Sequence, residues 1–179
     1  FWTCFAIRLD CPCERRGVSL VVRTRSNSTE TMLFLAPKET HPLETRVALV
    51  PAAAAKLVKL GASVAIESGA GMAAGHPDAD YEAAGASIVT DRSAALEQAD
   101  FVLRVLPAEL EEIRLQKPGS LATGLMEPFA SRERIDAYAA AGVTALCSEL
   151  IPRSTIAQKM DVLSSQANLA GYVAVITAT

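Results

Sequence analysis

Residues 151–172 combine reactive polar side chains with an apolar skeleton, and they read IPRSTIAQKMDVLSSQANLAGY. The polar set is an arginine, a glutamine, an aspartate and a serine, namely Arg153, Gln158, Asp161 and Ser164. If the chain is helical from about residue 157, the last three lie on one slowly drifting face, and Arg153 reaches in from the preceding loop. The pattern then indicates a polar ligand held at the edge of an apolar pocket.

The same residues have a purely structural interpretation. Arg153 and Asp161 can pair with each other, and the hydroxyls and amides of residues 164–168 can pack against another helix. Spacing alone slightly favours this second interpretation, so both stay open at this point.

A second polar segment is PKETHPLETRVALVP, residues 37–51. It lies between a predicted strand and a helix that starts with proline, where parallel α/β domains place loops at the carboxyl edge of the sheet. Arg46 can clamp an anion through two parallel hydrogen bonds. A salt bridge to Glu39 or Glu44 that shapes the loop is an equal alternative.

The glycine-rich run GAGMAAG, residues 69–75, follows a predicted strand and resembles a dinucleotide-binding loop. Its context differs, because HPDADYEAAGA follows and we expect the loop to continue instead of opening a helix. We therefore interpret the run as a structural turn, and His76 as a loop residue instead of a base or a metal ligand.

Short apolar runs alternate with helix-like stretches from Met32 onward. The predicted strands are residues 32–36, 63–67, 86–89, 101–106, 120–125 and 143–147. Helices are predicted over residues 51–61, with proline in the first turn, and 131–142, with a serine cap and a glycine stop. This alternation predicts an α/β fold of three layers, a parallel sheet with helices on both faces, Rossmann-like or flavodoxin-like.

Composition excludes several classes of protein. The chain has 179 residues, is 50% hydrophobic and carries a net charge of −3, which suits one globular domain without the basic field of a nucleic-acid binder. No apolar run approaches the ~20 residues that cross a bilayer, so we expect no direct membrane insertion. The cysteines Cys4, Cys11, Cys13 and Cys147 form neither a disulfide framework nor a paired metal motif.

The domain boundaries follow from changes in composition. Residues 1–31 are rich in arginine and serine and precede the first methionine, and we expect an unstructured leader outside the native domain. The domain proper is expected over residues 32–179. Its last stretch has helical spacing without a stop signal, so we expect a truncated interdomain helix and a chain that is the front part of a longer protein.

Residues 151–172, together with the 37–51 segment, GASVAIESGAGMAAGHPDADYEAAGASIV and ADFVLRVLP, resemble the N-terminal part of the alpha subunit of proton-translocating NAD(P) transhydrogenases. The resemblance covers nearly all of residues 32–179. It implies that Arg153, Gln158 and Asp161 hold the nicotinamide end of NAD(H) and act in catalysis. Ser164 and Tyr172 match further cofactor-binding positions, and no metal is implied.

The resemblance also implies a function and partners. The expected reaction is hydride transfer between NAD(H) and NADP(H), of the Si- or Re-specific class, coupled to proton movement. NADP(H) would bind a partner subunit, the membrane subunits would move the proton, and a Rossmann domain would follow Thr179. The implied state is a homodimer, peripheral to the inner membrane on its cytoplasmic side, and this fragment is expected to be inactive alone.

Two alternatives remain. Alanine dehydrogenase, the sibling family, shares the early motifs, but its substrate site resembles a lysine where this chain has Leu106 and a histidine that the run LMEPFA, residues 125–130, lacks. Met126 lies in that run, and Arg46 would then have an inherited structural role. The other alternative is a non-catalytic scaffold or dimerisation fragment.

Overall fold

The computed structural model describes residues 31–178, in which strands and helices alternate. The expectations for the leader, including Cys4, Cys11 and Cys13, fall outside the described residues. The strands are β1 (Leu33–Ala36), β2 (Ser63–Glu67), β3 (Ser87–Val89), β4 (Phe101–Leu103), β5 (Leu121–Gly124) and β6 (Thr144–Cys147). The α-helices are α1 (Pro51–Lys59), α2 (Asp78–Ala83), α3 (Arg92–Gln98), α4 (Leu110–Leu115), α5 (Arg132–Ala141) and α6 (Val162–Ala178). Three short 3₁₀ turns are η1 (Met72–Ala74), η2 (Ser148–Leu150) and η3 (Gln158–Met160).

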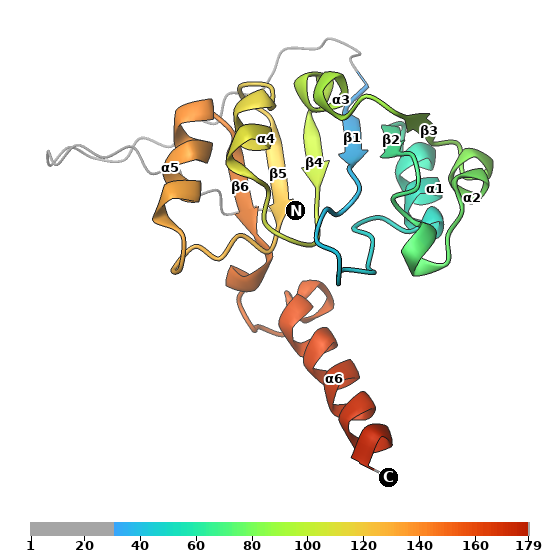
Figure 1. Ribbon diagram of the computed structural model, residues 1–179, viewed down its shortest axis with the longest axis vertical. Coiled ribbons are helices and arrows are strands. Elements are labelled where there is room, and N and C mark those ends of the chain that lie inside the picture. The colour runs from blue at the N-terminus through green and yellow to red at the C-terminus, as the bar shows by residue number, and fades with distance from the viewer. Residues whose placement is uncertain (1–30, 179) are drawn as a thin grey trace, which may run out of the picture.

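All the strands form one parallel sheet in the order β3-β2-β1-β4-β5-β6 (Figure 1), which confirms the predicted fold class. The strand order reverses between β1 and β4, where Leu35 is in register with Ala65 on one side and Val102 on the other. In open α/β sheets, ligands bind outside the carboxyl ends of the strands, next to such a reversal.

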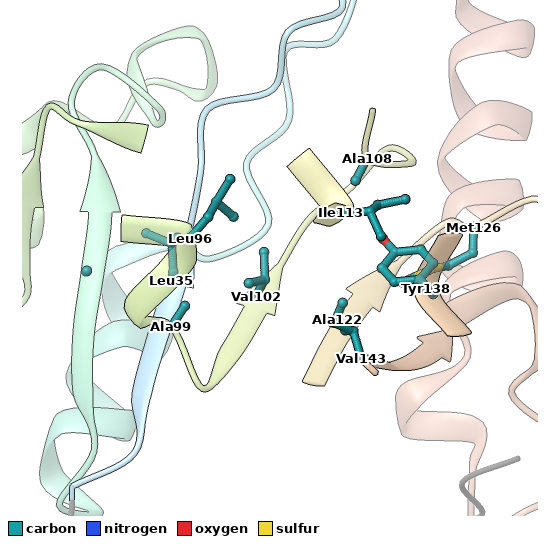
Figure 2. Close-up of a cluster of buried hydrophobic side chains, with 11 residues drawn as sticks. Leu35, Leu96, Ala99, Val102, Ala108, Ile113, Ala122, Met126, Tyr138 and Val143 are labelled. Carbon is teal, nitrogen blue, oxygen red and sulfur yellow. The ribbon is translucent and has the colours of Figure 1, made fainter. Parts of the chain in front are cut away.

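Two apolar clusters fill the space between the sheet and its helices. Leu35 belongs to the cluster beneath α3, α4 and α5, with Leu96, Ile113 and Tyr138 (Figure 2). The next residue, Ala36, belongs to the cluster beneath α1 and α2. Successive strand residues point to opposite faces, so a strand covered on both sides needs consecutive apolar residues. This requirement explains the run MLFLA.

The element boundaries correct three expectations. A helix, α2, does follow the glycine-rich run, and it begins directly after Pro77, which suits the first turn because proline has no amide to satisfy. Ser131 stands before α5, but its side chain makes no capping hydrogen bond. Strand β4 ends at Leu103 because the amides of Val105 and Leu106 turn to the carboxylate of Glu39, at 2.7 and 3.4 Å.

Helix α6 leaves the compact α/β body at the carboxyl edge of the sheet (Figure 1). None of its residues is buried, and its apolar side chains Leu169, Tyr172, Val173 and Ile176 are all more than half exposed. The segment that joins β6 to α6 runs beneath the strand ends and carries the predicted site residues.

Candidate functional site

The segment of residues 151–161 presents two polar side chains outward at the carboxyl edge of the sheet. Ala157 is 6% exposed and anchors the segment, whereas its neighbour Gln158 and Arg153 are exposed. Neither Arg153 nor Gln158 makes a side-chain hydrogen bond to another residue of the described part of the chain. Their donors therefore remain available to a ligand.

Asp161 ends this segment and caps α6. Its backbone is extended, with φ −73° and ψ 97°, and its carboxylate accepts hydrogen bonds from the Ser164 amide at 3.0 Å and the Ser164 hydroxyl at 2.5 Å. Aspartate is a preferred residue at this position because it satisfies an amide that the first helical turn leaves free. The expected helix from residue 157 is therefore wrong, since η3 and the capping residue interrupt it.

The capping hydrogen bonds keep Asp161 ionised. The pKa of its carboxyl lies below its ordinary value chiefly because of the hydrogen bond from the Ser164 hydroxyl, followed by the one from the Ser164 amide. The positive charge of Arg153 lowers this pKa further. Arg153 and Asp161 nevertheless form no ion pair within the described residues, so the interpretation of a simple structural pair is not what the structure contains.

Tyr172, the last predicted site residue, lies farther along α6. It is 68% exposed and follows Ser164 by eight positions, which corresponds to roughly 12 Å along a helix axis. The fold thus brings Asp161 and Ser164 into contact, with Arg153 near them, and leaves Tyr172 apart.

The second predicted segment, residues 37–51, reaches α6. The Nε and Nη2 atoms of Arg46 donate to the two carboxylate oxygens of Glu44 at 2.7 and 2.6 Å, which confirms the salt bridge as one of the two predicted alternatives. Hydrogen bonding from Arg46 lowers the pKa of Glu44. The Nη1 atom of Arg46 donates to Gln166 of α6 at 3.0 Å, a contact across 120 positions that no local pattern in the sequence reveals.

A network of charges ties the strand ends together. Arg92 donates to Glu67 at 2.9 Å and to Glu112 at 2.7 Å, and Glu112 also accepts from the buried Arg104. Burial by itself raises the pKa of Glu112, but the hydrogen bonds from Arg104 and Arg92 outweigh it, and the net pKa is lowered. Because each charge has an opposite neighbour, the network is a structural support.

The positions that matter for the alanine dehydrogenase alternative are occupied by backbone contacts and core packing. Leu106 lies where the amide groups turn toward Glu39, and Met126 is 2% exposed within the core cluster of α3, α4 and α5. Neither side chain can supply a cation or a proton to a substrate.

The glycine-rich run is a structural turn, as predicted. The Gly69 amide donates to the carboxylate of Asp78 at 2.9 Å, so a residue of the chain itself occupies the place that a phosphate would take. A Cβ on Gly71 would lie 2.6 Å from the His76 carbonyl oxygen and 2.7 Å from the Tyr81 ring. Close packing therefore accounts for this glycine, and His76 stacks edge-on to Tyr81 as a loop residue.

Two further searches concern residues 31–178. No group of three or more His, Cys, Asp or Glu side chains in this range is placed to hold a metal ion, and Cys147 is a free thiol. No helix in the same range has the length and apolar character that a membrane crossing requires.

Comparison with known proteins places the chain among related sequences. The family model for the N-terminal domain of alanine dehydrogenase/PNT matches residues 35–170. The first of the separately encoded parts of NAD(P) transhydrogenase subunit alpha from Rickettsia prowazekii is 39% identical over 152 residues, which cover 83% of this chain and 40% of that protein. Alanine dehydrogenase of Halomonas elongata is 32% identical over 142 residues, covering 73% and 38%.

The solved structures agree in fold. The transhydrogenase from Sinorhizobium meliloti superimposes with a TM-score of 0.78 at 44% identity and covers 82% of this chain and 43% of that one. The chain therefore spans about two fifths of the length of the relatives that it matches.

Proposed function

Because the chain belongs to the alanine dehydrogenase/PNT N-terminal domain family, we propose that it is part of the NAD(H)-binding subunit of a proton-translocating NAD(P) transhydrogenase. The observation that carries this proposal is the capped segment at the sheet edge, which presents Arg153, Gln158 and an ionised Asp161. The whole domain would span residues 32–179, followed by a Rossmann domain that binds the rest of the dinucleotide.

The donor set fits a nicotinamide ring. Bound NAD(H) would supply hydride chemistry, in which no substrate proton moves, so the protein needs no general base. Arg153 can donate hydrogen bonds to the carboxamide oxygen, and the negative charge of Asp161 favours the cationic, oxidised ring. Gln158 is neutral and can donate and accept at once, which suits a bridge to a second nucleotide. Ser164 contributes by fixing Asp161.

The remaining proposals follow from the relatives' names. Transhydrogenase alpha subunits work with other subunits, so we propose that NADP(H) binds a partner and that membrane subunits move the proton. A homodimer on the cytoplasmic side of the inner membrane is part of the same proposal. An alanine dehydrogenase activity is less well supported, because Leu106 and Met126 provide no substrate-binding cation or proton donor.

The test is the substitution Arg153→Ala in the intact subunit, combined with an NADP(H)-binding partner. NADPH-driven reduction of an NAD analogue, followed by absorbance, should fall on the order of 10²-fold, because ring positioning is worth that much in rate. The melting temperature should not change, since Arg153 is exposed and makes no hydrogen bond to the described protein.

The matched control is Lys159→Ala, which removes an exposed cation from the same segment and should leave the rate unchanged. A full rate in Arg153→Ala would contradict the site assignment. Alanine-dependent NADH formation in a parallel assay would contradict the function itself.

A further inference from the structure

Helix α6 is held to the α/β body by few polar contacts. Its Ser164, Ser165 and Thr177 side chains bond to residues within four positions in the chain. Gln166 differs, because its amide oxygen accepts a hydrogen bond from Arg46, which belongs to the segment between β1 and α1. This contact links the direction of α6 to the sheet.

Glu44 orients Arg46 for this contact. The fork of two hydrogen bonds from Nε and Nη2 fixes the plane of the guanidinium, and the Glu44 side chain is only 7% exposed. The same carboxylate accepts the Arg46 amide at 2.9 Å, so both ends of Arg46 are held. A fork of this kind leaves Nη1 pointing away from the carboxylate, toward α6.

Apolar packing beside the contact is loose. An open groove of about 450 Å³ separates the loop from α6, and its lining includes Leu43, Leu169 and Val173. The exposed fractions of Leu43 and Leu169 are 84% and 57%, so these side chains do not clamp the helix. The hydrogen bond between Arg46 and Gln166 therefore carries the orientation.

We propose that Arg46 is a positioning residue, which acts through Gln166 to fix α6 and the nicotinamide-binding segment that precedes it. Asp161 is bonded to Ser164, two positions before Gln166, so the capped end of the segment moves with the first turns of the helix. This inference rests on the proposed function for its effect on hydride transfer. The orientation of α6 itself does not depend on that function.

The first experiment measures orientation in the chain of 179 residues. Residual dipolar couplings of backbone amides report whether α6 shares one alignment with the sheet. Gln166→Leu keeps the side-chain size and removes the acceptor, and Arg46→Lys keeps the charge and removes the fork. Both variants should reduce the α6 couplings by about half or more while the sheet couplings stay unchanged.

The matched control is Asn168→Leu, which changes another exposed amide of the same helix and should keep the wild-type couplings. Wild-type α6 couplings in Gln166→Leu would overturn the proposal. An equal loss in Asn168→Leu would overturn it as well, because the effect would then be one of helix polarity.

The second experiment separates positioning from simple stability in the intact subunit with its NADP(H)-binding partner. Gln166→Leu should lower kcat ~10-fold while the KM for NAD(H) and the melting temperature stay close to wild type. An active wild type with an unchanged kcat in Gln166→Leu would overturn the positioning role. An inactive wild type would instead refute the proposed function, and the dipolar couplings would then decide whether Arg46 orients α6.

Discussion

Asp161 combines two roles that a single carboxylate can fulfil at once. Its oxygens cap α6 through Ser164, and its charge faces the segment where Arg153 and Gln158 are exposed. Since the cap satisfies an amide of the helix and Arg153 adds a nearby positive charge, the carboxylate remains ionised without being buried. A helix cap thereby keeps a negative charge fixed beside the proposed nicotinamide position.

This dual role can be separated by two substitutions. Asp161→Asn keeps a good capping side chain and removes the charge, so we expect unchanged protection of the α6 amides and a lower rate of hydride transfer. Asp161→Ala removes the cap too, and hydrogen exchange in the first turn of α6 should become faster. Equal exchange rates in the two variants would contradict the capping role.

The cap also predicts a pH dependence. Folding lowers the pKa of Asp161 below its ordinary 3.8, so the unfolded chain binds a proton more readily than the folded one. The stabilisation is therefore fully present above about pH 4 and is lost as the pH falls through the folded-state pKa. Amide exchange of α6 measured between about pH 3 and pH 6 should show this loss in the wild type but not in Asp161→Asn.

At the scale of elements, two glycines illustrate opposite constraints. Gly71 lies in the turn after β2, where an added Cβ would clash with the His76 carbonyl and the Tyr81 ring. Gly171 lies within α6, where an added Cβ would meet nothing within 4 Å. The first is required by packing, whereas the second only weakens its helix.

The same substitution should therefore act in opposite directions. We expect Gly71→Ala to lower the free energy of unfolding by about 1–3 kcal/mol, because the buried turn has no room for a methyl group. Gly171→Ala should increase the helicity and stability of α6, by up to about 1 kcal/mol. Urea denaturation of both variants checks the signs, and a stabilised Gly71→Ala would contradict the packing described for this turn.

At the scale of the whole molecule, the charged network joins loops from both halves of the sheet. Arg92 starts α3 and contacts the end of β2 and the segment after β1, while Arg104 follows β4 and shares Glu112 of α4 with it. The side chain of Arg104 is 5% exposed, so its charge depends on Glu112 for compensation.

Removing that compensation should destabilise the entire domain. Glu112→Gln is expected to cost about 3 kcal/mol, because it leaves a buried guanidinium without its carboxylate. Glu111→Gln is the control, since its neighbouring carboxylate is 79% exposed and pairs only loosely with Arg114 at 3.7 Å. Thermal unfolding near pH 7 should separate the two variants clearly, and equal melting temperatures would argue that the network is dispensable.

The sequence by itself determined the alternation of strands and helices, and hence the parallel sheet. Apolar runs such as MLFLA and helix boundaries such as Pro51 and Gly142 are local signals, because burial on two faces and backbone geometry restrict the residue types directly. The same local reasoning failed where two signals competed, as at Asp161, where the spacing of polar residues indicated a continuous helix and the capping aspartate interrupted it. The residue types of the candidate site were also visible in the sequence.

Only the tertiary structure decided which polar groups are free to bind and which are already bound. Arg46 had two possible partners nearby in the sequence, and the fold added Gln166, a contact that requires the segment after β1 and α6 to meet at the same sheet edge. Arg153 and Asp161 were candidates for a pair, and the fold gave Asp161 to Ser164 instead. Hydrogen bonds depend on position in space within a few tenths of an ångström, and the spacing of residues along a chain does not specify that position across 120 residues.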